Sequence, residues 1–279
     1  MDLPVCDTLI LSDVHLGADV SRAWDATAAL KSNSFRRLIL LGDIFADLNF
    51  GRLKKEHWQF LGLIRKLSNP KRKIEVIWVE GNHDTGLTDI MSHLVGVKVY
   101  QEYAWTYEGK RHLAIHGHQF DGFVVHNVRF NYIFGTLLYL QLQKLDSKSK
   151  VVTRFLDRLN TRWLRMSSKV AAGALHYAWQ RRVDRIFCGH THQAQHAQQD
   201  GIDYYNSGSW IDARPTYITI GNEGVRIHEY LDEDKCFELY EPGDDRDSSQ
   251  ERIEADSALA DFADEAGLPA DGSYDRVGS

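Results

Sequence analysis

This chain of 279 residues lacks the features that mark several large classes of protein. It has no run of 18 or more apolar residues, so no segment is predicted to span a membrane as a helix. Its three cysteines, Cys6, Cys188 and Cys236, are odd in number and widely spaced, which indicates reduced thiols rather than a disulfide framework. Residues 1–8 hold neither a basic region nor an apolar signal core. We therefore expect a cytoplasmic protein, with Cys188 serving only to fill the core.

The negative net charge is concentrated at one end of the chain. Of 39 acidic and 33 basic side chains, 12 and 3 respectively lie in residues 241–279, which gives this stretch a net charge of −9 and leaves +3 on the rest. From Pro242 onward the sequence is rich in Asp, Glu, Ser, Ala and Gly, with few apolar residues. Such a segment cannot bury enough surface to offset its ordering entropy, so we predict an acidic disordered tail over 242–279.

Five apolar runs, at 9–11, 38–41, 76–79, 113–115 and 186–188, each lead into residues of the types that bind metals. Runs of this length bounded by glycine are typical of buried strands, and polar residues at their ends fall on one edge of a sheet. The side chains that follow them are Asp13 and His15, Asp43, Asn82, His116, and His190 and His192.

These seven side chains predict a site for two metal ions. Two divalent ions held together need roughly seven to eight protein ligands, with one carboxylate between them. Oxygen and imidazole ligands without cysteine suit Mn²⁺, Fe²⁺, Co²⁺ or Zn²⁺ better than a thiolate-bound structural zinc. A single histidine of this kind is more often a hydrogen-bonded core or surface residue, but five motifs in order at strand ends argue against that interpretation.

Periodicity along the chain predicts an α/β fold. Residues 5–118 alternate between apolar strands and amphipathic helices, and the last third is again strand-like. We expect helices at 24–34, 56–67 and 88–94, strands at 97–107, 111–115, 203–206, 216–220 and 225–230, and hairpin turns at 108–110 and 221–224.

Residues 120–182 interrupt this alternation with long stretches compatible with helices. The first part is unusually apolar, and residues 144–185 hold 11 Lys or Arg against 3 Asp. Arg154, Arg158, Arg162 and Arg165 fall at three- and four-residue spacing and would line one helix face. One interpretation is a solvated basic face. The other is a cap over the metal centre, apolar for an acyl chain and basic for phosphates or anionic lipid headgroups, with Arg165 and Lys169 contacting the substrate.

The ordered motifs Asp-x-His, Gly-Asp, Gly-Asn-His-Asp, His-Gly-His and Gly-His-Thr-His, spread over residues 12–192, resemble those of the calcineurin-like metallophosphoesterases. The details at 12–17, 42–45 and 189–194 look most similar to the branch that contains UDP-2,3-diacylglucosamine pyrophosphatases of lipid A synthesis. One position departs from that branch, because His83 stands where its well-studied members carry arginine. The resemblance implies an α-β-β-α sandwich of two sheets over residues 1–241, with a helical insertion at 120–182 that forms an acyl-chain pocket.

The resemblance also implies a role for each motif residue. The first metal would be held by Asp13, His15 and His192, and the second by Asn82, His116 and His190, with Asp43 bridging them. In the wider family the histidine at position 83 protonates the leaving group, paired with the carboxylate at Asp84. His118 is left open as an outer hydrogen-bond donor, a phosphate contact or a rim residue, and Asp121 either orients His118 or contacts the substrate.

Three classes of function follow. The first is a Mn²⁺-dependent pyrophosphatase of the UDP-2,3-diacylglucosamine type, acting on a nucleotide-linked lipid and touching the anionic inner membrane face through its basic cap. The second is a broader phosphoesterase for a phosphoprotein, cyclic nucleotide or small phosphate ester, favoured by His83. The third, a scaffold that has lost its ligands, is opposed by the complete set of seven. Nucleic acid is disfavoured, because the basic residues would lie on a cap rather than along a groove.

Overall fold

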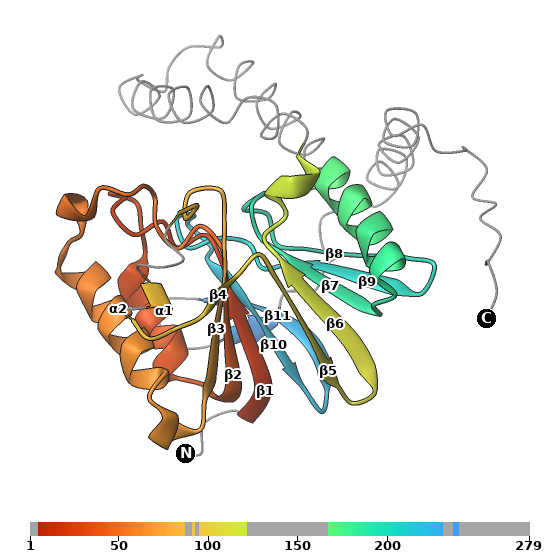
Figure 1. Ribbon diagram of the computed structural model, residues 1–279, viewed down its shortest axis with the longest axis horizontal. Helices are drawn as coiled ribbons and strands as arrows, with labels where there is room; N and C mark the ends of the chain where they lie inside the picture. The colour runs from red at the N-terminus through yellow and green to blue at the C-terminus, as the bar shows by residue number, and fades with distance from the viewer. Residues whose placement is uncertain (1–4, 87–90, 93–94, 122–166, 231–236, 240–279) are drawn as a thin grey trace, which may run out of the picture.

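Two β-sheets packed face to face form the centre of the computed structural model, which describes residues 5–86, 91–92, 95–121, 167–230 and 237–239. Helices cover the outer face of each sheet, with α1 and α2 on one side and the helix over residues 167–181 on the other (Figure 1). This is the predicted α/β sandwich of two sheets.

Sheet 1 has seven strands in the order β12-β11-β10-β1-β2-β3-β4. They are β1 (Val5–Leu11), β2 (Ser34–Leu41), β3 (Glu75–Val79), β4 (Val99–Tyr100), β10 (Thr216–Gly221), β11 (Gly224–Tyr230) and β12 (Phe237–Leu239). Strands β1 to β4 are parallel, and α1 (Ala23–Lys31) and α2 (Lys55–Leu67) lie in the connections between the first three. Such strands are buried on both faces, so Leu9 packs toward the helices and Ile10 toward the second sheet. Their sequences are therefore continuously apolar.

Sheet 2 has five strands in the order β5-β6-β7-β9-β8. They are β5 (Glu102–Tyr107), β6 (Lys110–Ile115), β7 (Arg185–Cys188), β8 (Gln195–Gln199) and β9 (Ile202–Asn206). The parallel strands β6, β7 and β9 form its centre, and β5 and β8 add antiparallel edges. Three short 3₁₀ turns, η1 (Phe50–Arg52), η2 (Pro70–Arg72) and η3 (His118–Phe120), complete the described elements.

The helix over residues 167–181 is part of the core. Its residues Ala171, Ala174, Leu175 and Ala178 pack against Leu113, Ile115 and Ile186 on the outer face of sheet 2. Residues 167–181, which the expected cap of 120–182 includes, thus seal the outer face of sheet 2 with small apolar side chains. Residues 122–166, with the arginine series that ends at Arg165, lie outside the described residues, as do those of the predicted tail.

Most other predicted elements are confirmed, with shifted boundaries. Helix α2 starts one residue before the predicted 56, and α1 ends at Lys31 because Ser34 already belongs to β2. The stretch 97–107 forms two strands in different sheets, β4 and β5, instead of one. Both predicted hairpins are present, and Glu108 and Gly109 have the positive φ angles of a two-residue turn. Of the predicted helix at 88–94, only residues 91–92 are described, and they are helical.

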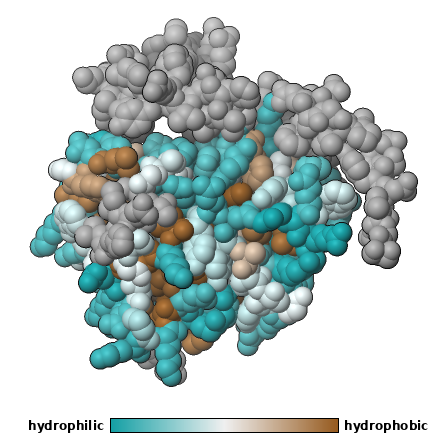
Figure 2. Space-filling view, in the orientation of Figure 1, coloured by the Kyte–Doolittle hydropathy of each residue, from teal (hydrophilic) through white to brown (hydrophobic). Residues whose placement is uncertain are grey.

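The surface of the described residues gives few further clues. Among them, no helix is long and apolar enough to cross a bilayer. On the face shown in Figure 2, hydrophobic residues lie scattered among hydrophilic ones. The most exposed large hydrophobic side chains are Val5, Trp24, Leu48, Trp58 and Trp179. Cys188 is fully buried, as expected of a core-filling residue.

Candidate metal centre

The five motifs meet at one edge of the sandwich, where the carboxyl ends of β1, β2, β3, β6 and β7 come together. We call this edge the rim. Five of the seven predicted ligands there have a left-handed backbone: Asp13 (φ 52°), His15 (φ 48°), Asp43 (φ 50°), His190 (φ 69°) and His192 (φ 60°). Non-glycine residues seldom adopt this conformation, and strain of this kind gathers at functional sites. The rim is thus built for side-chain placement at some cost to the backbone.

Glycines in the motifs allow the loops to approach one another closely. A Cβ on Gly81 would lie 2.2 Å from both the backbone nitrogen and Oδ1 of Asp43. A Cβ on Gly189 would lie 2.5 Å from Asp13 Oδ2 and from Ser12 Oγ. The glycines that precede Asn82 and His190 are therefore required because any side chain would displace a predicted ligand.

The first group consists of Asp13, His15 and His192. The Nε2 atoms of His15 and His192 are 3.3 Å apart, and they lie 3.8 Å and 3.3 Å, respectively, from Asp13 Oδ1. An ion bound at roughly 2.0–2.2 Å by each atom would place neighbouring ligands about 3–3.6 Å apart. Asp13 Oδ1 is buried and has no hydrogen-bond partner among the described residues. The spacing and chemistry of this group fit a divalent ion.

The second group consists of Asp43, His116 and His190, which offer ligand atoms within 4.8 Å of one another. His116 Nδ1 lies 2.8 Å from the carbonyl oxygen of Leu41 and donates to it, so Nε2, 3.3 Å from Asp43 Oδ2, is the ring atom that would face a metal ion. Asn82 Oδ1 is also buried without a hydrogen-bond partner among the described side chains. The structure thus gathers six of the predicted ligands in two groups, while the place of Asn82, the bridging role of Asp43 and the binding of metal stay predictions.

Electrostatics favour a positive charge between these groups. Burial opposes protonation of both His15 and His116. At His15 burial prevails and lowers the pKa to about 3, which leaves the neutral imidazole that a metal requires. At His116 the charges of Asp43 and Asp13 outweigh burial and raise the pKa to about 9. The same negative potential would stabilise divalent ions placed beside Asp43.

His83 enters the site in a different way from that expected. Its Nδ1 lies 2.7 Å from the carbonyl oxygen of Ala46, and its Nε2 lies 3.9 Å from Asp43 Oδ2. The expected pairing of His83 with Asp84 is wrong. The Asp84 carboxylate is 1% exposed and accepts hydrogen bonds from the backbone N–H groups of Ile44 and Phe45. His83 therefore presents Nε2 toward the ligand groups while a main-chain carbonyl orients its ring.

Of the four side chains predicted to contact the substrate, the structure describes three. The His118 ring lies 5.5 Å from that of His116, and burial together with the neighbouring His116 and His190 lowers its pKa to about 3. Asp121 Oδ2 lies 3.3 Å from His190 Nε2. Lys169 is half-buried in the helix over residues 167–181, while Arg165 lies outside the described residues. Substrate contacts by these side chains stay predictions.

A polar network that sequence reasoning missed fastens the loops of the rim. The buried Asn206 side chain donates to the carbonyl oxygen of Gly189 at 2.6 Å, and its Oδ1 accepts from the backbone of Gly208. Ser12 Oγ lies 2.8 Å from Ser207 Oγ, which ties the first motif to the same loop. The signal available in the sequence was the polar stretch 206–209 directly after an apolar strand.

Comparison with known proteins agrees with this geometry. A model of the calcineurin-like phosphoesterase superfamily domain matches residues 7–221. No curated protein matches the chain.

Solved structures with similar folds are distant in sequence. Vacuolar Protein Sorting 29 from Cryptosporidium parvum is 14% identical, with 84% of this chain and 96% of that chain covered and a TM-score of 0.47. A predicted phosphoesterase from Streptococcus pneumoniae is 13% identical, with 85% and 94% covered and a TM-score of 0.41. An archaeal phosphodiesterase is 14% identical, with 84% and 98% covered and a TM-score of 0.41.

Proposed function

The chain belongs to the calcineurin-like phosphoesterase superfamily, and from that premise we propose that it is a hydrolase of phosphate esters or anhydrides that uses two divalent ions. One observation carries this proposal: two groups of three ligand atoms, one with Asp13 and the other with Asp43, are gathered at the rim. Asp13 Oδ1, Asn82 Oδ1 and His116 Nε2 are buried there without hydrogen-bond partners among the described residues. Since an unpaired buried polar atom costs about 1–3 kcal/mol, such a set is best explained by ions that complete it.

The seven ligands have distinct tasks in this reaction. Asp13, His15 and His192 would hold one ion, Asn82, His116 and His190 the other, and Asp43 would bridge them. Bound ions of this kind polarise phosphoryl oxygens and lower the pKa of a shared water toward neutrality. Mn²⁺ is the ion we propose, with Fe²⁺, Co²⁺ and Zn²⁺ as alternatives.

His83 would donate the proton to the leaving group. Its Nδ1 is fixed on the Ala46 carbonyl oxygen, its Nε2 faces the site, and one third of its side chain is exposed, so a substrate oxygen can reach it. Geometry of this type satisfies the first requirement of a general acid, which is reach.

For the substrate, we propose a diphosphate-linked lipid of the UDP-2,3-diacylglucosamine type. The support is the detail of the motifs at 12–17, 42–45 and 189–194 and the apolar and basic composition of residues 122–166. Such a substrate would place the protein in the cytoplasm, in peripheral contact with the inner membrane face.

The decisive experiment is a parallel assay of the purified protein with Mn²⁺ on three substrates. These are UDP-2,3-diacylglucosamine, a cyclic dinucleotide and p-nitrophenyl phosphate. Release of UMP and the diacylglucosamine 1-phosphate from the first alone supports the lipid substrate. Hydrolysis of the second or third alone would favour the alternative, a general phosphoesterase, which His83 in place of arginine also favours.

Acyl-chain length provides a sharper test of the lipid substrate. Each buried methylene contributes roughly 0.8 kcal/mol, so affinity should fall about fourfold for every carbon removed from a buried chain. Replacing residues 122–166 by a short linker should abolish this dependence and spare hydrolysis of p-nitrophenyl phosphate, because the helix over 167–181 that seals sheet 2 is retained. Affinity that does not change with chain length would exclude an acyl-binding cap.

A further inference from the structure

The loops that follow β2 and β3 are joined by reciprocal hydrogen bonds. The backbone nitrogen of His83 donates to Asp43 Oδ1 at 2.8 Å. In return, the backbone nitrogens of Ile44 and Phe45 donate to the two oxygens of Asp84 at 3.1 Å and 2.9 Å. Each loop thus supplies the carboxylate that binds the other loop's main chain. We call these three bonds the clasp.

The clasp limits what the Asp43 carboxylate can do. Its Oδ1 is occupied by the His83 amide, whereas its Oδ2 faces His116 Nε2 at 3.3 Å and His83 Nε2 at 3.9 Å. The two amides held by Asp84 directly follow Asp43, whose own backbone is in the left-handed region at φ 50°. Without an acceptor at Asp84, this strained turn could relax and rotate the carboxylate away from the ligand groups.

Keeping a carboxylate at position 84 is electrostatically costly. Asp84 is 1% exposed, about as deeply buried as the neighbouring acid Asp43, and Trp78 Nε1, at 3.4 Å, is only a distant third donor. A residue needed only for packing would not require a buried acid next to another acid.

We propose that Asp84 is a positioning residue, which holds the Asp43 turn through the amides of Ile44 and Phe45 so that the second carboxylate oxygen of Asp43, Oδ2, faces the residues that would hold the metal ions. This inference deepens the proposed function and rests on it. Asn at this position would keep the size of the side chain but turn an amide N–H toward one of the two backbone donors. One bond of the clasp would be lost, and the Oδ2 position would no longer be fixed.

The test is metal binding without substrate. Mn²⁺ titration calorimetry and electron paramagnetic resonance of the Mn²⁺-loaded protein are compared for wild type, Asp84→Asn and the control Glu75→Gln. Glu75 is a carboxylate at the opposite end of β3 that also accepts two hydrogen bonds, from Arg37 and Tyr103. For Asp84→Asn we expect Mn²⁺ affinity to fall roughly 10–100-fold, the usual effect of losing an outer partner of a metal ligand, with an altered spin-coupling pattern. Glu75→Gln should bind two Mn²⁺ ions like wild type.

The outcomes separate the inference from the proposed function. If Asp84→Asn melts at a lower temperature but keeps wild-type Mn²⁺ affinity and spin coupling, Asp84 is merely structural and the inference is overturned. If it does not fold, Asp84→Glu retains the charge with a displaced carboxylate and must still weaken Mn²⁺ binding; normal affinity would overturn the inference. A wild-type protein that binds no pair of Mn²⁺ ions would overturn the proposed function itself.

Discussion

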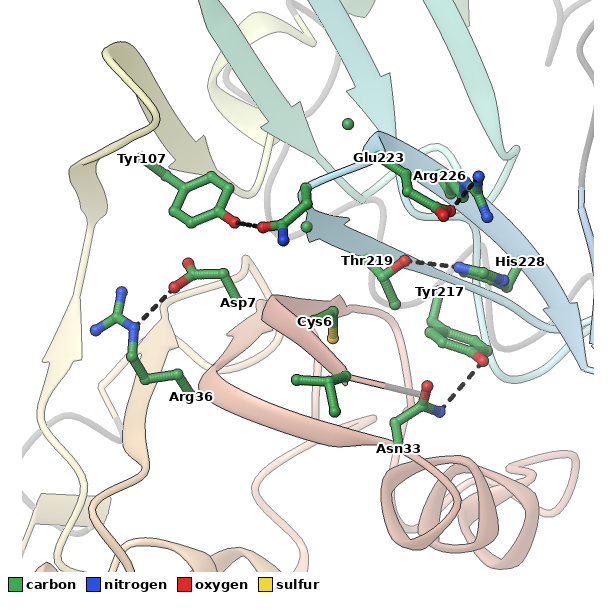
Figure 3. A pocket seen from close by; sticks show the side chains of 14 residues that line it. Cys6, Asp7, Asn33, Arg36, Tyr107, Tyr217, Thr219, Glu223, Arg226 and His228 are labelled. Carbon is green, nitrogen blue, oxygen red and sulfur yellow. Dashed lines mark hydrogen bonds and ion pairs between the residues drawn. The ribbon is translucent and has the colours of Figure 1, made fainter. Parts of the chain in front are cut away.

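The two edges of the sandwich are both polar, but they differ in how their polar groups are satisfied. At the edge opposite the rim, side chains line an open cavity of about 770 Å³ and bond to one another (Figure 3). Arg36 pairs with Asp7 at 2.7 Å, and Tyr107 donates to Asn222 at 2.9 Å. Among the described residues that line this cavity, no buried side-chain polar atom lacks a hydrogen-bond partner.

At the rim, by contrast, several buried polar atoms lack hydrogen-bond partners. Asp13 Oδ1, Asn82 Oδ1, His116 Nε2 and His118 Nδ1 are buried and lack hydrogen-bond partners among the described residues. Elsewhere in the described chain, partnerless atoms belong to Trp105, His112, Arg185 and Trp210, side chains held by ring stacking or an ion pair. Polarity alone therefore does not mark a site. What marks it is a convergence of buried ligand atoms without hydrogen bonds among the described residues.

The largest expected effect on turnover and metal content appears when one carboxylate is substituted at each edge. Asp43→Asn should abolish turnover without unfolding the protein, because it removes the charge that both ions share, and the metal content should fall below two per chain. Asp7→Asn, at the opposite edge, should leave both quantities unchanged. Metal analysis and steady-state rates check this pair. An Asp43→Asn protein with two tightly bound ions and a normal rate would remove the basis for the dinuclear site.

A smaller effect is expected at His83. His83→Ala should lower the rate by roughly 10²–10⁴, the range usual for loss of a general acid, while metal content stays near that of wild type. The loss should shrink for p-nitrophenyl phosphate, whose leaving group needs little protonation. His228→Ala, which removes a hydrogen bond to Thr219 at the opposite edge, is the control. Equal losses on all substrates would indicate that His83 binds the substrate or supports the structure of the site instead of donating a proton.

Substitution of Arg37 should affect stability alone. Arg37 is 6% exposed, donates to Glu75 at 2.8 Å and lies 5.7 Å from the centre of the Trp105 ring, away from the rim. Arg37→Met should lower the free energy of unfolding by about 2 kcal/mol, the value of a hydrogen bond to a charged partner. Urea denaturation measures this loss, and Mn²⁺ affinity measured on the same sample should be unchanged. A loss of Mn²⁺ affinity would show that the two edges are coupled.

The smallest predicted effect depends on pH. Burial, followed by the charge of Arg185, lowers the pKa of His112 to about 4, and its ring stacks on Trp105. Because the unfolded chain binds this proton near pH 6.5, stability is present above that pH and is lost as the pH falls toward 4. Between pH 7 and 5 the loss should be about 1–2 kcal/mol. In the metal-free protein, His112→Phe should reduce the change in unfolding free energy between pH 7 and 5 by that amount. An unchanged pH dependence would show that other groups cause it.

The sequence correctly predicted those structural elements whose signal lies in neighbouring residues. Apolar runs buried on both faces predicted the parallel strands, and the glycine-flanked polar residues at their ends predicted the ligands. The edge strand β8 was missed because Gln195, Gln198 and Gln199 give it no apolar pattern, and its pairing with β9 defines it. The helix over 167–181 was assigned to a cap because its alanines and single leucine gave no sign of which surface they would cover.

The sequence by itself predicted the candidate ligands and their order, since these follow from residue types at strand ends. The need for glycine before Asn82 and His190 comes from the close approach of Asp43 and Asp13 in the folded protein. Only the tertiary structure decided that Asp84 turns inward to hold the Asp43 loop, that the Ala46 carbonyl orients His83, and that Asp121 approaches His190. The physical reason is distance along the chain. Asp84 bonds to amides 39 and 40 residues away, and Asp121 lies 69 residues from His190. Contacts of this kind arise when two strands or two sheets are brought together, and nothing in the neighbouring sequence specifies them.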